Sequence, residues 1–194
     1  MSGTDDDDEQ VIALAPDAST RRFYRHVRGA ETWVAMEYGQ ALPASGDAYL
    51  EMAEYLKRLG IPVPSVRGVD RDAGRVELTD LGDVTLESLV AGSPRSVWRP
   101  LYDEAVDLIL RLQRGARERP EPARPCFHVA LDEARLLFEL QYFREHFIEG
   151  LRRVSLAPAA RERLDAGFSA LAAEEAAQPQ ALSHRDYHSR NIMV

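Results

Sequence analysis

The sequence of 194 residues predicts an α+β protein in which a β-rich amino-terminal part with one helix precedes a mainly helical part. Two observations lead to this prediction. Between residues 11 and 79, short β-prone runs alternate with turn signals. Beyond residue 85, apolar residues recur with the 3.6-residue period of helices. The length suffices for one large or two small domains with a buried core.

The amino-terminal part follows an acidic segment, residues 1–10, whose composition predicts a disordered tail. A loop containing Gly29 separates two β-prone runs, which together predict a hairpin. One helix is expected from about Gly46 to Leu59, with Asp47 as its amino-terminal cap. The expected strands are the runs 11–14, 23–27, 32–36, 65–69 and 75–78.

The helical part has three long periodic segments separated by proline-containing connectors. Pro158 is expected in the first turn of the third helix, where proline is tolerated. An apolar triplet at 192–194 predicts a short strand at the end of the chain. The helices are expected around the apolar stripe Leu101, Ala105, Leu108, Ile109 and Leu112, from Asp132 to about Gly150, and from Ser155 to Ala177.

Composition excludes several classes of protein. The net charge is −8, of which residues 5–9 supply −5, so the remaining −3 leaves no basic footprint for nucleic acid. The single cysteine, Cys126, rules out an internal disulfide framework and a cysteine-based zinc site. No apolar run reaches the length of a membrane helix, and the first residues lack the basic and apolar regions of a signal peptide. A soluble, cytoplasmic protein is expected.

The segment 182–194 contains the pattern H-R-D-x-x-x-x-N, which is typical of the catalytic loop of protein-kinase-like phosphotransferases. In such a loop Asp186 would orient the acceptor hydroxyl and accept its proton, and Asn191 would bind a metal ion that neutralises the transferring phosphoryl group. His188 is a candidate catalytic residue that would bring a proton or positive charge near the phosphoryl group, or else a structural hydrogen bond. His184 is expected to support the loop by packing.

With His188 two residues after Asp186, this segment resembles the aminoglycoside phosphotransferase/choline kinase-like enzymes. Residues 17–25 and 77–86 are similar to a bacterial branch whose members phosphorylate the anomeric hydroxyl of cell-wall amino sugars. The resemblance spans roughly residues 11–194. It implies a two-lobed protein-kinase-like fold that uses ATP and Mg²⁺. The implied parts are a nucleotide-binding N-lobe at 11–79, a hinge at 80–85 and a partial helical C-lobe at 86–194.

The nucleotide-binding part of the sequence departs from the usual kinase motifs at two places. The expected phosphate loop has no glycine, so Ser19 and Thr20 are the candidates for phosphate contacts there. The strand that should resemble V-A-I-K reads Val-Ala-Met-Glu, with Ala35 expected at the nucleotide and Glu37 in place of the usual lysine. Arg21 or Arg25, on the same strand face as Phe23, is a candidate substitute cation. The backbone of Asp80 and Leu81 is expected to bind the adenine edge.

The motif of a second metal-binding aspartate would follow the catalytic loop, and no residue follows Val194. The sequence is therefore expected to be the front part of a kinase and to be inactive by itself. The predicted acceptor is a small molecule with a hydroxyl group, first an amino sugar such as N-acetylmuramate or N-acetylglucosamine, and second an aminoglycoside or amino alcohol. The alternative is a non-catalytic nucleotide-binding pseudokinase or regulatory domain, which Glu37 favours. No oligomeric state is predicted.

Overall fold

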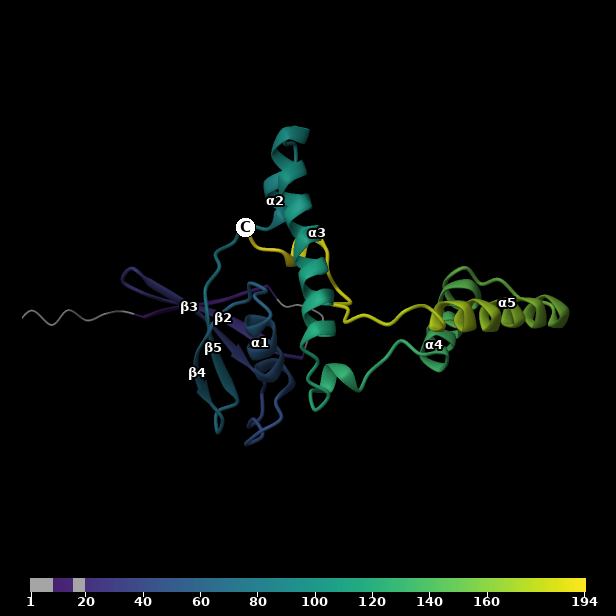
Figure 1. Cartoon of the computed structure of the whole chain (residues 1–194), viewed down its shortest axis with the longest axis horizontal. Helices are drawn as coiled ribbons and strands as arrows, with labels where there is room; N and C mark the ends of the chain where they lie inside the picture. The colour runs from purple at the N-terminus through teal and green to yellow at the C-terminus, as the bar shows by residue number, and fades with distance from the viewer. Residues whose placement is uncertain (1–8, 16–19) are drawn as a thin grey trace, which may run out of the picture. The chain divides into compact units, whose positions relative to one another are not determined.

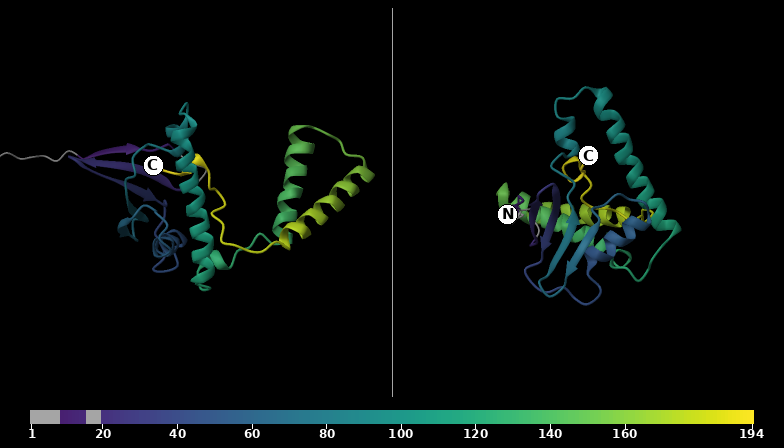
Figure 2. Two further views of the ribbon diagram at one scale, coloured as in Figure 1. Left: turned by 45° about the horizontal axis from the view of Figure 1, so that its top comes forward. Right: turned by 90° about the vertical axis from the view of Figure 1, so that its left-hand side faces the viewer.

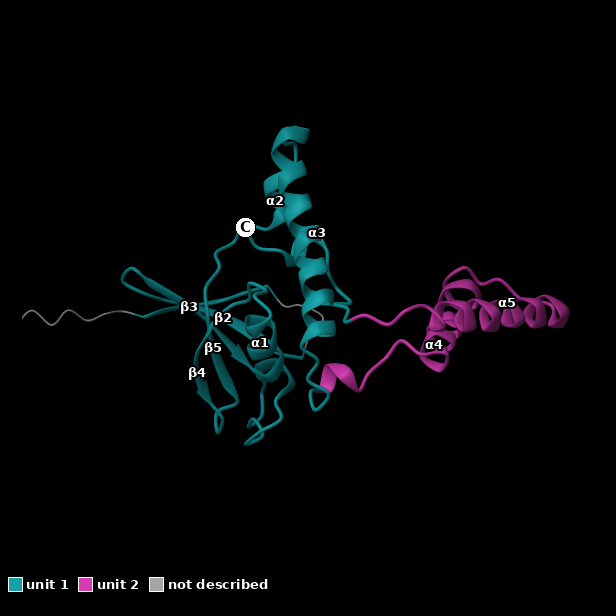
Figure 3. Ribbon diagram, viewed as in Figure 1, with its two compact units in different colours: residues 1–124, 182–194 teal, residues 125–181 magenta. Residues whose placement is uncertain are grey.

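A computed structural model describes residues 9–15 and 20–194. The chain forms two compact units, the first made of residues 1–124 and 182–194 and the second of residues 125–181 (Figure 3). The mixture of one sheet and several helices confirms the predicted α+β class. The lobe boundaries at 79/80 and 85/86 remain predictions, because both predicted lobes contribute to the first unit.

The first unit is built on an antiparallel sheet of five strands in the order β1-β2-β3-β5-β4 (Figure 1). The predicted hairpin is present, and its two-residue turn places Gly29 at φ +58°, a conformation that glycine adopts without strain. The predicted strands are therefore confirmed, with small shifts at their ends. They are β1 Gln10–Ala13, β2 Arg22–Arg28, β3 Glu31–Glu37, β4 Val66–Asp70 and β5 Arg75–Thr79.

Helix α1, Ala48–Arg58, covers one face of this sheet. Its predicted cap is confirmed, because the Leu50 N–H donates to the Asp47 carboxylate at 3.0 Å. Burial of apolar side chains between the helix and the sheet forms the core of this unit. That core contains Met36, Leu42, Val76 and Leu78, with Phe23, Val34, Tyr38, Tyr49 and Leu50 packed against it.

Two helices follow the sheet in the same unit. The short helix α2, Leu86–Val90, was not predicted; it begins at Thr85 with a reciprocal cap in which Thr85 and Ser88 exchange hydrogen bonds. The long helix α3, Arg95–Glu118, confirms the predicted apolar stripe. Its buried Gly115 allows close approach to Leu59, just beyond the end of α1.

The second unit contains the helices η1 Pro125–Phe127, α4 Glu133–Phe143, η2 Arg144–Leu151 and α5 Pro158–Ala176. The predicted helix 132–150 continues through Phe143 but changes from α to π geometry in η2. Helix α5 begins with Pro158 in its first turn, as expected. Within this unit α4 and α5 run in opposite directions and pack against each other (Figure 2).

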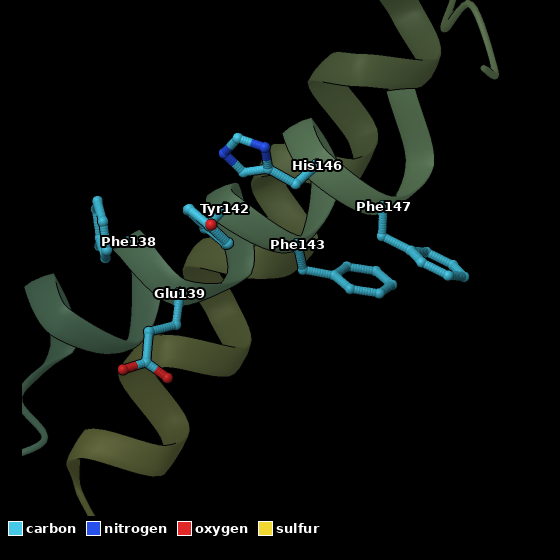
Figure 4. A pocket seen from close by; sticks show the side chains of 6 residues that line it. All are labelled: Phe138, Glu139, Tyr142, Phe143, His146 and Phe147. Atoms are coloured by element: carbon cyan, nitrogen blue, oxygen red, sulfur yellow. The ribbon is translucent and has the colours of Figure 1, made fainter. Parts of the chain in front are cut away.

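Aromatic side chains lie exposed along α4 and η2. They line an open pocket of about 440 Å³ within the second unit (Figure 4). Phe143 stacks on Phe147, and Tyr142 lies against His146 with ring centroids 4.0 Å apart. The pocket-lining residues are Phe138, Glu139, Tyr142, Phe143, His146 and Phe147.

The predicted acidic tail extends two residues too far. Its first eight residues lie outside the described part of the chain, but Gln10 is the first residue of β1. Glu9 contacts the ring of His26 at 2.5 Å and also pairs with Arg28, so two side chains of β2 hold it. Among the residues that the structure describes, no helix has the length and apolar character to cross a membrane.

Gly74 provides a test of the turn between β4 and β5. It has φ +65°, and a Cβ added there would lie 1.8 Å from the carbonyl oxygen of Gln40. We expect Gly74→Ala to lower the free energy of unfolding by about 3 kcal/mol, because the backbone must move as well as hold alanine in a left-handed conformation. Urea denaturation measures the loss.

Gly39→Ala is the matched control for this substitution. Gly39 has a similar φ of +71° but open space around the added Cβ. We expect it to cost about 1 kcal/mol, which is the conformational penalty alone. Equal losses in the two variants would contradict the steric explanation.

Candidate active site

The segment that carries the H-R-D-x-x-x-x-N pattern returns to the first unit and lies beside α2 and α3 (Figures 1 and 2). Two backbone hydrogen bonds attach it: Leu86 donates to Ile192 at 2.8 Å, and Val194 donates to Val84 at 3.0 Å. The hydroxyl of Tyr187 also donates to the carbonyl of Ala105 in α3 at 2.8 Å. The loop is therefore attached to the first unit next to Asp186, through Tyr187, and again just after Asn191.

The strand predicted at 192–194 is reduced to a single antiparallel bridge between Thr85 and Met193. The apolar triplet was a correct sign of an extended segment. However, α2 begins immediately after Thr85, so the ladder cannot continue on that side. The bridge still gives the loop a defined register against the segment that follows the sheet.

Asp186 and Asn191 come together as the spacing of the motif predicts. The side-chain amide of Asn191 donates to the Asp186 carboxylate at 2.7 Å and lies 3.1 Å from the Asp186 carbonyl oxygen. Both side chains are exposed, so the carboxylate can be reached by a second molecule. A short helix, η3 Ser189–Asn191, closes the loop between them.

His188 contacts the same carboxylate from the other side. Its Nε2 lies 3.2 Å from Asp186 Oδ1, while its Nδ1 accepts a hydrogen bond from the Arg190 N–H at 3.3 Å. With Nδ1 as acceptor, we assign the proton of the neutral ring to Nε2, which points it at Asp186. Of the two roles considered for His188, this geometry corresponds to a hydrogen bond that orients the carboxylate.

Residues 184 and 185 shape the loop before Asp186. The ring of His184 packs edge-on against Tyr187, with centroids 5.5 Å apart, which agrees with the expected supporting role. Arg185 has φ +69°, a left-handed conformation that is costly for a residue with a Cβ. Such strain persists only where surrounding contacts impose it, and the attachments on both sides of the loop provide them here.

The side chain of Asn191 is suited to a metal ion. Its amide nitrogen is used by Asp186, and within the described residues its amide oxygen accepts no hydrogen bond from the protein. An amide oxygen is a ligand type that Mg²⁺ accepts, usually together with phosphate oxygens and water. Residues 9–15 and 20–194 contain no cluster of three or more histidine, cysteine or acidic side chains that could hold a metal ion. The Asn191 amide oxygen fits an ion that takes its other ligands from phosphate and water.

The sheet separates the predicted nucleotide-binding residues between its two faces. Cross-strand partners share a face, so Phe23 lies with Met36, whereas Ala35 lies with Glu77 on the other face. Met36 and Phe23 belong to the core beneath α1. Ala35 is fully buried on the opposite face, away from the side on which Arg21 was expected to act.

Glu37 shares the face of Ala35. Its register partner on β5 is Arg75, and the two side chains form an ion pair at 3.3 Å. The acid in the position of the usual lysine is thus paired with the neighbouring strand β5, on the face of the sheet opposite α1. The reason is the strict alternation of side chains along β3, which places Met36, one residue earlier, on the face of α1.

Arg21 lies on the α1 side of the sheet, just before β2. Its guanidinium carbon is 5.9 Å from the ring centroid of Tyr38 and 5.7 Å from that of Tyr49. One of its nitrogens lies 3.6 Å from the sulfur of Met36. Burial raises the pKa of both tyrosines, so they remain neutral and present ring faces to the cation.

Arg25 has a different environment although it lies on the same face. Its guanidinium forms a two-point ion pair with Asp80, at 2.7 and 3.0 Å, and a second pair with Asp83 at 2.9 Å. Burial raises the pKa of Asp80, but the bonds from Arg25 and from the Gly82 N–H outweigh it, so that pKa lies below its ordinary value. Of the two candidate cations, Arg25 is already bound to carboxylates.

The remaining predicted contacts lie at the two ends of the β-rich part. Thr20 is exposed, and Ser19 lies outside the described residues. Leu81 is also exposed, and in the described part of the chain neither its N–H nor its carbonyl is hydrogen-bonded to protein. The backbone of Leu81 is therefore open to a ligand, whereas the Asp80 side chain is occupied by Arg25.

Sequence reasoning did not identify Asp83, Tyr38 and Tyr49 as parts of this region. Asp83 lies in the stretch 77–86 that carries part of the resemblance, so its acid was visible but had no assigned partner. The two tyrosines appear in the sequence as ordinary apolar positions. Only the pairing of β2 with β3, and the docking of α1, bring them to Arg21.

A model of the phosphotransferase enzyme family matches residues 10–194. Relatives include an N-acetylmuramate/N-acetylglucosamine kinase of Pseudomonas aeruginosa, which is 29% identical over 188 residues that cover 95% of this chain and 52% of that protein. Proteins of the same name from Caulobacter vibrioides and Neisseria meningitidis are each 27% identical, over 93% and 96% of this chain.

The chain spans about half the length of these relatives, 57% of the Caulobacter protein and 54% of the Neisseria protein. The family match, in contrast, extends from the first strand of the sheet to the last residue. It includes the sheet, the exposed backbone of Leu81 and the loop with Asp186 and Asn191. The chain therefore belongs to the phosphotransferase enzyme family.

Proposed function

We propose that the whole protein transfers the terminal phosphoryl group of ATP to a hydroxyl group of a small molecule. The observation that carries this proposal is the joining of Asp186 and Asn191, 2.7 Å apart, on a loop attached to the segment that leaves the sheet. An amino sugar such as N-acetylmuramate or N-acetylglucosamine is the first acceptor to test, because the named relatives are kinases of these sugars. An aminoglycoside is the second.

Asp186 has the chemistry for a general base. Its carboxylate would accept the proton of the acceptor hydroxyl as that oxygen bonds to the γ-phosphorus and the bond from phosphorus to the β,γ-bridging oxygen breaks. The Nε2–H of His188 and the amide of Asn191 each bond one carboxylate oxygen, which fixes its orientation. His188 therefore acts as a positioning residue in this proposal.

Asn191 and Arg21 would bind the phosphate end of the nucleotide. When Mg²⁺ is bound, it supplies charge neutralisation for the phosphates. The amide oxygen of Asn191 would be its protein ligand. Arg21 is the better substitute for the usual lysine, because Arg25 is held by two carboxylates and Glu37 is paired on the other face of the sheet. The Leu81 backbone would bind the adenine edge.

Glu37 does not favour the alternative, a non-catalytic nucleotide-binding domain. It would disfavour catalysis only if its carboxylate faced the phosphates and repelled them. In the structure Glu37 pairs with Arg75 on the face opposite Phe23. Turnover of Mg·ATP by the whole protein against a panel of amino sugars and aminoglycosides separates a catalyst from a binding domain.

Asp186→Asn tests the proposed base. This substitution keeps the size of the side chain but removes the group that accepts the proton, so we expect kcat to fall at least 100-fold with little change in the KM for ATP. The matched control is Asp103→Asn, which removes an exposed carboxylate of α3 whose ion-pair partner among the described residues is Arg99 on the same helix. An Asp186→Asn protein with more than half of the wild-type kcat would contradict the assignment.

Arg21→Gln tests the proposed phosphate contact. We expect the Kd for ATP to rise about tenfold, since a hydrogen bond to a charged group is lost, while the Kd for adenosine stays within twofold. Isothermal titration with the two ligands provides both values.

The control for this measurement is Arg22→Gln. Arg22 is the next residue along the chain, is exposed, and its side chain lies on the other face of β2. We expect both of its Kd values to match the wild type. If Arg21→Gln raised the Kd for adenosine and the Kd for ATP by the same factor, Arg21 would not act on phosphate.

A further inference from the structure

The guanidinium of Arg25 connects strand β2 to the segment that follows β5. Arg25, in β2, bonds three of the four residues that follow Thr79 at the end of β5. Its Nε lies 2.7 Å from the Asp80 carboxylate in an ion pair, and its Nη2 donates to the same carboxylate at 3.0 Å. Nη1 donates to Asp83 at 2.9 Å, and Nη2 also donates to the Gly82 carbonyl at 3.1 Å. We call Arg25, Asp80, Gly82 and Asp83 the Arg25 cluster.

Burial makes this cluster more than a surface ion pair. The side chains of Arg25 and Asp80 are only 15% and 7% exposed, whereas that of Asp83 is 78% exposed. Removing one partner of such a largely enclosed pair leaves the other charge partly desolvated without compensation. Asp80 is therefore the inner anchor of the cluster, and Asp83 adds a weaker, solvent-screened contact.

The cluster also sets the path of the backbone. Gly82 has φ +79°, and its N–H donates to the Asp80 carboxylate at 3.0 Å, so the chain turns tightly around the group that Arg25 holds. Leu81 lies between the two fixed residues. Its N–H and carbonyl have no protein partner within the described residues, whereas its neighbours Asp80 and Gly82 are both held by hydrogen bonds.

The position of Arg25 separates its role from that of Arg21. Four residues along one strand correspond to about 13 Å, so the two arginines act at opposite ends of the same face. Arg21 lies among aromatic rings near α1, and Arg25 lies at the segment that leaves the sheet. A cation that is already shared by two carboxylates has little charge left for phosphate.

We propose that Arg25 is a positioning residue that holds residues 80–83 in the conformation in which the Leu81 backbone binds the adenine base. This inference rests on the proposed function, because it assumes a nucleotide at Leu81. It assigns to Arg25 an effect on the base end of the ligand and none on the phosphates. The apparent Kd rises in proportion as the binding-competent fraction of this segment falls.

Arg25→Gln and Arg25→Lys test the inference. Lysine keeps the charge, but a single ammonium group cannot span Asp80, Gly82 and Asp83 at once. We expect the Kd for adenosine and the Kd for ATP to rise by the same factor, about tenfold for glutamine and about threefold for lysine. In the ligand-free chain, hydrogen–deuterium exchange of the Gly82 amide should accelerate by at least the same factor.

Arg67→Gln is the matched control. Arg67, in β4, also bonds one carboxylate, that of Glu31, and one backbone carbonyl, that of Thr32, at 3.2 Å. Its guanidinium lies over the ring of Trp33, on the face of the sheet opposite Arg25. We expect its loss to leave both Kd values and the Gly82 exchange rate within twofold of the wild type.

The outcomes are distinct. A higher Kd for ATP with an unchanged Kd for adenosine would assign Arg25 to the phosphates and overturn the inference. An unchanged exchange rate of the Gly82 amide in the folded Arg25→Lys protein would also overturn it. Loss of thermal stability with both Kd values unchanged would reduce Arg25 to a structural role and also overturn it. A whole wild-type protein that binds neither ligand would contradict the proposed function instead, while the exchange measurement would still test the Arg25 cluster.

Discussion

The backbone hydrogen bonds between residues 84–86 and residues 192–194 are the constraint on which the candidate site depends. They join segments more than a hundred residues apart, so their formation requires closure of a very long loop. Once they form, they place the end of the sheet and the loop of Asp186 beside each other. The bond from Tyr187 to α3 and the left-handed Arg185 then leave the loop few alternative shapes. The geometry of Asp186 and Asn191 is thus a consequence of tertiary contacts as much as of their spacing.

Much of the fold and part of the site could be predicted from local sequence. Alternation of apolar residues and turn signals identified every strand of the sheet, and Asp47 identified the start of α1, because these depend on residues a few positions apart. The pairing of Asp186 with Asn191 was predictable for the same reason. The short helix α2 was not, because its five residues carry too little periodicity. The change to π geometry after Phe143 likewise left no recognisable pattern.

The partners of the arginines could not be predicted, because they depend on which strand lies next to which and in what register. A shift of one position along β3 exchanges the two faces of the sheet. Glu37 therefore had an uncertain meaning in the sequence, whereas the register with Arg75 gives it a clear partner. Similarly, Arg21 and Arg25 look equivalent in the sequence. Their environments differ because one lies near α1 and the other near Asp80.

The second unit leaves the first after residue 124 and returns to it at residue 182, so it is an insertion with two connections. Its helices α4 and α5 pack on each other and form a small body of their own. Lengthening such an excursion adds little to the entropy of closing it, since that cost grows only logarithmically with length. Evolution can therefore remodel residues 125–181 extensively while the bonds around Asp186, which lie entirely outside the insertion, stay as they are.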